Sequence, residues 1–264
     1  MPDALEEYRK RGWTVFASDP AIRSWAEACA PLAERISSDP NHAHWWRCDG
    51  TWFAGVNVLP NDARGGVDGE IPPLSGSVIS FIEQSLGFED VAFDAAQISI
   101  VTPGYPALGE EDTEASWRFR IKRCAAHVDG LERSMPDRRR KLSETHGFLL
   151  GIPLSDANAE QGAFVVWEGS HELMRAAFRE RFADTPPESW RSLDITQAYT
   201  AARKQVFERC TPVEIAPGLG AAYVMHPLAL HGVAPWRGGD APARAVAYFR
   251  PDTFGGDPEA WLNS

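Results

Sequence analysis

The chain has 264 residues, of which 44% are hydrophobic and 24% charged, and its net charge is −11. These values are ordinary for a soluble globular protein, and the charge excludes a general binder of nucleic acids or anionic membranes, which needs a basic face. No apolar run approaches the roughly 20 residues that span a bilayer, and the acidic N-terminus lacks the pattern of a signal peptide. The four cysteines are scattered, so we expect reduced thiols and a cytoplasmic location.

The first 90 residues read as a mainly helical part of the chain. Apolar residues recur at a spacing of three to four after Asp19, which is a helix cap followed by a proline at the first helical position. A long stretch rich in Trp, Gly and Pro then indicates packed, irregular structure with one strand. The expected elements are a helix over 4–11, a strand over 13–16, a helix over 20–36, the irregular segment over 41–75 and a helix over 75–87.

From about 91 to 254 the sequence predicts a β-rich core with one helical insert, at about 172–210. Short strands joined by turns are typical of a jelly roll or barrel, whereas a doubly wound sheet would alternate strands with helices. We therefore expect a mainly β fold with flanking helices, formed by one domain over 1–264. The expected strands lie at 91–101, 117–122, 145–154, 163–167, 213–215, 221–225 and 243–250.

A His-x-Asp pair, His127 and Asp129, follows the strand expected at 117–122. Side chains two apart on a strand point to one face, so an imidazole nitrogen and a carboxylate oxygen aim at the same point. Such a pair can hold two adjacent positions on a divalent first-row metal. A third ligand completes the 2-His-1-carboxylate triad of non-haem Fe(II) oxygenases. His226 and His231 are the candidates for that third ligand.

Arg244 opens the last expected strand and shares a face with Val246 and Tyr248. A guanidinium that faces an apolar barrel needs an anionic partner, because an unpaired buried charge is costly. Its planar fork fits a carboxylate in two parallel hydrogen bonds. A metal site with one inward arginine suits a keto-acid co-substrate: the metal takes the 2-oxo acid end, and the arginine takes the far carboxylate.

Taken together, "GWTVF", "HVD", "GIPLSDANAEQGAFVVWEGSH" and "MHPLALHGVAPW…RAVAYF" resemble the phytanoyl-CoA dioxygenase-like family of Fe(II)/2-oxoglutarate-dependent oxygenases. The resemblance implies a double-stranded β-helix core, which is a cupin-like jelly roll. It also implies that His127, Asp129 and His231 bind iron and that Arg244 binds the C5 carboxylate of 2-oxoglutarate. The family's "HPL" ahead of the ligand histidine favours His231 over His226. We also expect Gln97, on the strand at 91–101, to contribute to co-substrate binding.

The family implies an enzyme that uses Fe(II), 2-oxoglutarate and O2 and releases succinate and CO2. Related halogenases have a small residue at the position of Asp129, so we expect hydroxylation of a small or acyl-type substrate. Arg138 and Arg139 are candidates for contacting an anionic substrate, although a solvated loop is the alternative. Trp167 and Trp236, close to the family motifs, are candidates for the pocket wall.

Two other functions fit the same residues. One is a cupin-like metal enzyme that does not use 2-oxoglutarate, in which Arg244 would serve the substrate. The other is a non-catalytic ligand-binding protein on the same fold. The sequence leaves open the primary substrate, the oligomeric state and the role of His226, and it favours a structural, hydrogen-bonded role for His146.

Overall fold

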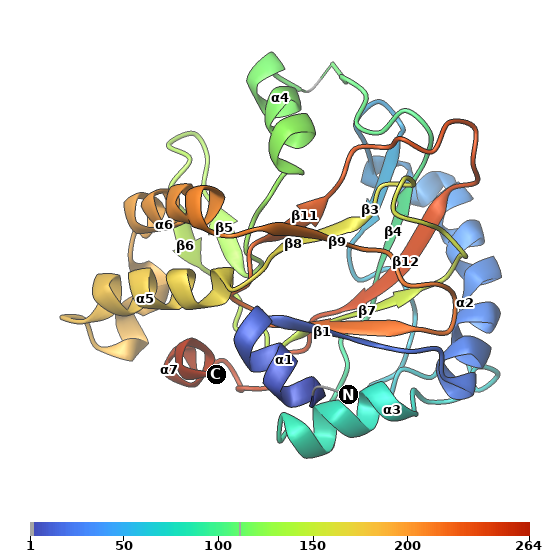
Figure 1. The fold of residues 1–264 in the computed structure, drawn as a ribbon, viewed down its shortest axis with the longest axis horizontal. Helices are drawn as coiled ribbons and strands as arrows, with labels where there is room; N and C mark the ends of the chain where they lie inside the picture. Colours follow the sequence, from blue (N-terminus) through green and yellow to red (C-terminus); the bar gives the residue numbers. More distant parts are fainter. Residues whose placement is uncertain (1–2, 111) are drawn as a thin grey trace.

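The computed structural model describes residues 3–110 and 112–264, and two antiparallel sheets form its centre (Figure 1). The larger sheet has the order β1 (Trp13–Phe16), β10 (Ala222–Met225), β7 (Leu149–Pro153), β12 (Arg244–Phe249), β4 (Gln97–Val101), β3 (Trp52–Gly55) and β2 (Trp46–Arg47). The smaller sheet has the order β11 (His231–Val233), β8 (Phe164–Trp167) and β9 (Pro212–Ile215).

The chain crosses repeatedly between these two sheets. It runs from β7 in the larger sheet to β8 and β9 in the smaller one, returns as β10, crosses to β11 and ends in β12. A single bridge between His127 and His231 adds one more segment to the smaller sheet, beside β11. This winding is that of a double-stranded β-helix, so the expected mainly β jelly roll with flanking helices is confirmed.

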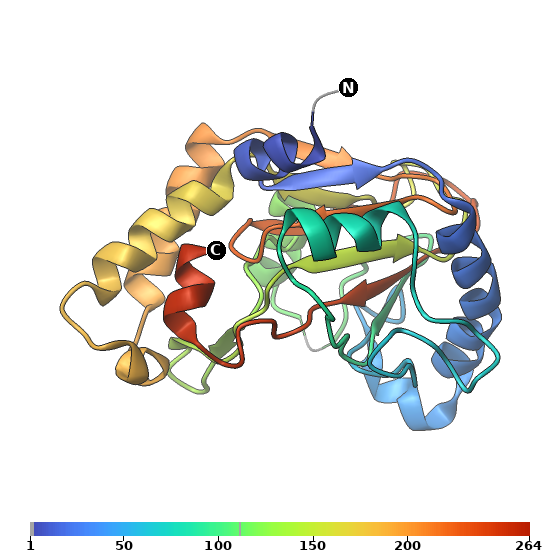
Figure 2. The ribbon, with the colours of Figure 1, turned by 90° about the horizontal axis from the view of Figure 1, so that it is seen from below.

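Alternation along the strands decides which side chains lie between the sheets. On β8, Phe164 and Val166 face inward and pack with Tyr223, Met225 and Tyr248 of the larger sheet. The other face of the larger sheet is covered by helices, as Figure 2 shows. The covering helices are α2 (Pro20–Ser38) and α3 (Ser77–Ser80), which continues into a π-helical turn over Phe81–Ser85; α1 (Ala4–Arg11) leads into β1.

The smaller sheet is covered by a second group of helices. Val165 and Trp167 point outward from β8 and pack with α5 (Ser170–Phe182), α6 (Thr196–Arg209) and α7 (Pro258–Asn263). A 3₁₀ helix, Pro187–Ser192, joins α5 to α6. The helices expected between β8 and β9 are therefore present, whereas α7 was not expected. Within the described residues, no helix has both the length and the apolar character needed to cross a membrane.

The strand expected at 117–122 was wrong, because this segment forms helix α4 (Glu114–Arg123). The side chain of Thr113 caps the helix by accepting a hydrogen bond from the Ser116 amide at 3.1 Å. An acidic residue lies in its first turn and basic residues in its last, which suits the helix dipole. None of the α4 residues is buried, so packing did not impose the strand that the alternating apolar residues suggested.

The loop expected after Asp129 contains a two-stranded hairpin, β5 (Leu131–Arg133) and β6 (Arg140–Leu142). The irregular segment at 41–75 contains two strands rather than one, preceded by a 3₁₀ helix over Pro40–Trp45. The N-terminal part thus contributes three strands to the larger sheet in addition to its helices.

Candidate metal centre and its cavity

The structure brings His127, Asp129 and His231 together at the edge of the smaller sheet. One ligand atom from each lies within 4.8 Å of the others. Backbone pairing fixes this arrangement, because the amide of His127 donates to the His231 carbonyl at 2.8 Å and the reverse bond measures 2.9 Å. His127 and His231 are therefore directly opposite one another, and Asp129 follows two residues later. His231 is thus the histidine that the fold places beside the His-x-Asp pair.

The spacing of the three side chains fits a first-row metal ion. His127 Nε2 lies 3.2 Å from Asp129 Oδ1, and His231 Nε2 lies 3.5 Å from Asp129 Oδ2. Two atoms in adjacent positions on an ion, each about 2.1 Å from it, are about 3 Å apart. Small side-chain adjustments therefore suffice for three ligands on one face of an octahedron, which leaves positions open on the other side.

Both imidazole rings are held with the same nitrogen toward the cluster. His127 Nδ1 lies 3.1 Å from the Ala125 carbonyl oxygen, and His231 Nδ1 lies 3.1 Å from the Ala229 carbonyl oxygen. A carbonyl oxygen only accepts, so each Nδ1 carries the proton and each Nε2 presents its lone pair. Hydrogen bonds of this kind orient metal-ligating histidines and raise their basicity.

Arg250 is a further member of the site that the sequence reading did not identify. Its Nη1 lies 3.5 Å from Asp129 Oδ2, and its Nη2 donates to Gln97 Oε1 at 2.7 Å. Burial opposes ionisation of Asp129, but when the imidazoles carry protons on Nε2 in place of a metal, the charges of His231 and Arg250 and hydrogen bonds from both histidines hold the pKa of Asp129 well below its ordinary value. The carboxylate is therefore ionised and ready to bind a cation. Gln97, expected at the co-substrate, is tied to the cluster through Arg250.

Gly232 explains the close approach of β11 to the segment before the His-x-Asp pair. A Cβ atom at Gly232 would lie 2.0 Å from the Cys124 carbonyl oxygen. That same oxygen accepts a hydrogen bond from the Val233 amide at 3.0 Å. Only glycine allows the two backbones to approach this closely, and their approach sets the distance between the two histidines.

Arg244 lies between the two sheets with 4% of its surface exposed. Its Nη2 donates to the Tyr248 hydroxyl at 3.1 Å, and the Tyr223 hydroxyl donates to the same oxygen at 2.9 Å. Its Nη1 is buried and has no hydrogen-bond partner among the described residues. An unsatisfied buried donor on a charged group is costly, so this nitrogen points to an anionic partner.

One aromatic ring connects this arginine with the metal cluster. The Phe164 ring stacks on His231 with centroids 5.4 Å apart and contacts Tyr248 at 5.9 Å. A molecule held by both the metal and Arg244 would therefore lie beside Phe164. A small cavity of about 10 Å³, roughly the room of one water, adjoins Arg244 and Tyr223, and none of the three cluster residues lines it.

A large cavity of about 1210 Å³ opens at the other side of the cluster. The exposed fraction of the side chain is 44% for His127, 12% for Asp129 and 5% for His231, so the cluster faces the cavity through His127. Six arginines line this cavity, together with the backbone and side chains around the His-x-Asp pair. They are Arg47, Arg120, Arg133, Arg138, Arg140 and Arg203.

The residues expected to contact substrate are only partly at this cavity. Arg138 lines it, whereas Arg139 turns away toward Asp137 and Asp194, at 3.9 and 3.7 Å. Trp167 is 3% exposed and packs among the helices, because strand alternation places it on the outer face of β8. Trp236 packs beside Tyr105 and donates to the Gly239 carbonyl at 2.8 Å, so it does not line the cavity either.

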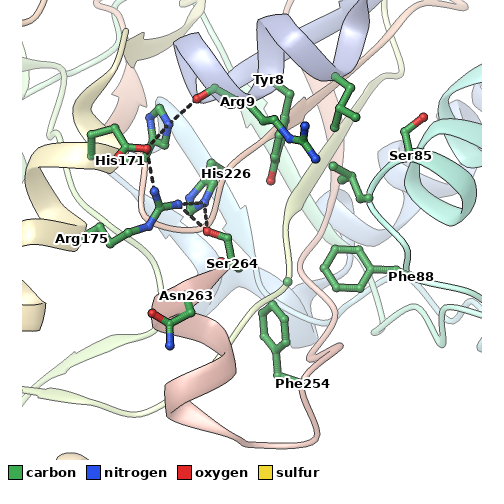
Figure 3. Close-up of a pocket in the computed structure, with 14 residues that line it drawn as sticks. Tyr8, Arg9, Ser85, Phe88, His171, Arg175, His226, Phe254, Asn263 and Ser264 are labelled. Atoms are coloured by element: carbon green, nitrogen blue, oxygen red, sulfur yellow. Dashed lines mark hydrogen bonds and ion pairs between the residues drawn. The ribbon is translucent and has the colours of Figure 1, made fainter.

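His226, the other candidate for the third ligand, belongs to a separate pocket of about 450 Å³ (Figure 3). Its ring lies 4.9 Å from that of His171 and 5.8 Å from that of Tyr8. Its Nδ1 accepts from the Leu228 amide at 3.0 Å, and burial lowers its pKa well below the ordinary value. The Pro227 turn therefore sends the two histidines in different directions.

His146 also lies outside the metal cluster, and its Nε2 is 2.9 Å from the Glu144 carboxylate.

The sequence analysis missed Arg250 although a signal was present, since Arg250 continues the alternation of Arg244, Val246 and Tyr248 by two residues. No comparable signal pointed to Arg203, because it comes from a distant helix.

Comparison with solved structures returns non-haem, 2-oxoglutarate-dependent enzymes. The carbocyclase SnoK from nogalamycin biosynthesis shares 14% identity at a TM-score of 0.49, and the match covers 96% of this chain and 84% of SnoK. HygX from Streptomyces hygroscopicus, with nickel, 2-oxoglutarate and hygromycin B bound, shares 14% identity at 0.46, covering 97% of this chain and 89% of HygX. EctD from S. alaskensis, with 2-oxoglutarate and 5-hydroxyectoine, shares 15% identity at 0.47, covering 95% of this chain and 78% of EctD. No family model and no curated protein sequence matches the chain. At these identities and TM-scores, the likeness carries no conclusion about a substrate or a reaction.

Proposed function

We propose that the protein is an Fe(II)- and 2-oxoglutarate-dependent dioxygenase that hydroxylates a small molecule. One observation carries the proposal: a cluster of two histidines and one carboxylate, open on one side, lies on the same β-helix as the buried Arg244. Among the described residues, Nη1 of this arginine has no hydrogen-bond partner. A three-ligand cluster alone would suit several metals and reactions. The buried guanidinium adds the need for a carboxylate, which 2-oxoglutarate supplies at C5.

His127, Asp129 and His231 would hold the iron. Bound iron supplies the activation of O2 and the oxidation of 2-oxoglutarate to succinate and CO2, which drive oxidation of a C–H bond. A site that ligates through two imidazoles and one carboxylate is typical of non-haem Fe(II) oxygenases. Asp129 supplies a carboxylate ligand at the position where related halogenases have a small residue, which favours hydroxylation over halogenation.

The other residues of the site would orient the co-substrate and the metal ligands. Arg244 would donate two parallel hydrogen bonds to the far carboxylate of 2-oxoglutarate, and Tyr248 accepts the 3.1 Å hydrogen bond that orients its guanidinium. Arg250 would orient Asp129 through its contact of 3.5 Å, and Gln97 orients Arg250 by accepting its hydrogen bond. The primary substrate would approach from the large cavity, where the edge of His127 is exposed. In this proposal the two molecules bind on opposite sides of the cluster.

Succinate release tests this proposal directly. Purified protein would be incubated with Fe(II), 2-oxoglutarate and air, and succinate would be measured by mass spectrometry with each component omitted in turn. We expect succinate only when all three are present, and none from His127→Ala. Succinate formation by His127→Ala equal to that of the wild type would refute the role of the cluster. Oxidation of a substrate without 2-oxoglutarate would favour the cupin-like alternative, and metal binding with no turnover would favour a ligand-binding protein.

A further inference from the structure

Three arginines gather at one end of the large cavity. Arg133 and Arg140 are directly opposite one another in the β5–β6 hairpin, and Arg203 comes from α6, which lies on the same side of the molecule (Figure 1). Like charges directly opposite in an antiparallel pair destabilise a hairpin. Burial, together with the charges of Arg203 and Arg133, lowers the pKa of Arg140 below its ordinary value. The fold therefore tolerates a repulsion that contributes nothing to its stability.

Carboxylates of the protein do not neutralise this cluster. None of the three guanidinium groups forms an ion pair within the part of the chain that the structure describes, whereas the neighbouring Arg139 pairs with Asp137 and Asp194. Aromatic rings position two of the arginines: Arg140 lies 4.5 Å and Arg203 5.3 Å from the centre of the Tyr199 ring, and Arg140 Nη1 also donates to the Leu131 carbonyl at 3.5 Å. Stacking on an aromatic face leaves the N–H donors at the edge of a guanidinium free to bind a ligand.

Helix α6 adds hydroxyl groups beside the arginines. Thr196 and Thr200 line the same cavity as Arg203, and their spacing of four and three residues places all three on one face of the helix. The hydroxyl of Thr196 accepts a hydrogen bond from the Arg140 amide at 2.7 Å, which ties the helix to the hairpin. Its own proton and the Thr200 hydroxyl supply further donors. The cluster thus combines three cations with neutral donors around one space.

We propose that Arg133, Arg140 and Arg203, with Thr200, bind a phosphate monoester group of the primary substrate. This inference rests on the proposed function, because it places the substrate in the cavity that the metal cluster faces. A phosphate monoester carries up to two negative charges and three acceptor oxygens, which balance three guanidinium groups better than a single carboxylate does. Arg133 is four residues from Asp129, so their Cα atoms are at most about 14 Å apart. The oxidised carbon and the phosphate would therefore belong to one small metabolite.

Calorimetric titration of the full-length chain as purified, with no iron or 2-oxoglutarate added, tests the site. The probes are inorganic phosphate and methyl phosphate at fixed ionic strength. The variants are Arg133→Gln and Arg203→Gln, and Arg139→Gln is the matched control, because it removes the same charge from the same hairpin outside the cavity. We expect both probes to bind the wild type and the control with equal affinity, within about twofold. Each cavity variant should bind at least about tenfold more weakly, as expected for loss of a charge-assisted hydrogen bond.

Three results would overturn the proposal. The first is that the wild type binds neither probe. The second is that Arg139→Gln weakens binding as much as the cavity variants do, which would indicate an adventitious ion only. The third is that inorganic phosphate binds and methyl phosphate does not, which would indicate a site for free phosphate. Thermal unfolding in phosphate-free buffer shows whether the variants are folded. Because Arg133→Gln removes one of two repelling charges, its melting temperature should be equal to or above that of the wild type. A lower value would assign Arg133 a structural role. Because no iron or 2-oxoglutarate is used, a negative result in this titration would not contradict the proposed function, which the succinate assay tests separately.

Discussion

The metal cluster depends on which nitrogen each histidine presents. Carbonyl oxygens hold both Nδ1 atoms, so the two Nε2 atoms converge beside the ionised Asp129. The side chains of His127 and Asp129 converge, but the strand that was expected to carry them is absent: helix α4 precedes the pair, and a single bridge joins His127 to His231. Strand alternation also did not decide between His226 and His231, because a turn at Pro227 interrupts it. The structure separates the two histidines into different pockets.

We predict that His127→Ala loses metal affinity by more than about 100-fold, since even the loss of an outer-shell partner costs 10–100-fold. The control is His226→Ala, which removes an imidazole from the separate pocket and should leave metal binding unchanged. Binding of Mn(II) followed by electron paramagnetic resonance measures both variants. Loss of Mn(II) binding in His226→Ala, with binding retained in His231→Ala, would reverse the assignment of the third ligand.

At the scale of elements, the approach of β11 to the Cys124 carbonyl sets the geometry of the cluster. We expect Gly232→Ala to destabilise the protein by about 1–3 kcal/mol, as overpacking does, and to weaken Mn(II) binding. The added Cβ meets a backbone oxygen, which cannot turn aside. Gly218→Ala is the control, because there the nearest atom is a side-chain oxygen of Asp156 at 3.1 Å. Urea unfolding and Mn(II) titration of both variants check the expectation, and equal effects would contradict it.

Asp19 joins two helices on the outer face of the larger sheet. Its carboxylate accepts from the Ala21 amide at the start of α2 and from the Ser77 amide at the start of α3, both at 2.9 Å. These bonds, that from Ser77 first, lower the pKa of Asp19. We expect Asp19→Ala to reduce the free energy of unfolding by about 1–2 kcal/mol at pH 7.

The pH dependence of that loss has a defined sign. A carboxyl group whose pKa is lowered by folding stabilises the protein above its unfolded pKa of about 3.9, and the effect is lost as the pH falls toward the folded pKa. The difference between wild type and Asp19→Ala should therefore be constant from pH 7 to pH 5 and shrink below about pH 4. Asp19→Asn keeps an oxygen acceptor and should lose less at pH 7. Urea unfolding across this range measures the effect, and a difference that grows on acidification would contradict it.

The elements that the sequence predicted well are those that packing enforces. The apolar stripe after Asp19 became α2, and the apolar runs at 163–167 and 221–225 became the buried strands β8 and β10. The failure at 117–122 has the opposite cause. Its alternating Trp, Phe and Ile side chains fit a strand, but none is buried, so the caps and end charges of α4 decided its conformation.

At the scale of the whole molecule, the two sheets assemble a site from residues that are far apart in the sequence. Arg244 lies on β12 and His231 on β11, and the ring of Phe164 contacts both His231 and Tyr248, the hydrogen-bond partner of Arg244. The fold class was predictable from motifs that resemble a family, and the same motifs named the four residues that we propose for the iron and 2-oxoglutarate site. Of the arginines of the large cavity the sequence named only Arg138, because a residue such as Arg203 reaches the cavity from a helix whose position only tertiary packing defines.

We propose that one molecule of 2-oxoglutarate contacts both the metal and Arg244. The most direct test is to measure the affinity of 2-oxoglutarate for the Mn(II)-loaded wild type and for Mn(II)-loaded Arg244→Ala. Loss of the guanidinium leaves the C5 carboxylate desolvated and unpaired, at a cost on the order of 2–5 kcal/mol, or roughly 30-fold or more in affinity. Pyruvate, a 2-oxo acid without the distal carboxylate, should lose much less, and Mn(II) binding should be unchanged. If Arg244→Ala binds 2-oxoglutarate as tightly as the wild type, the arginine is structural and the proposed co-substrate is wrong.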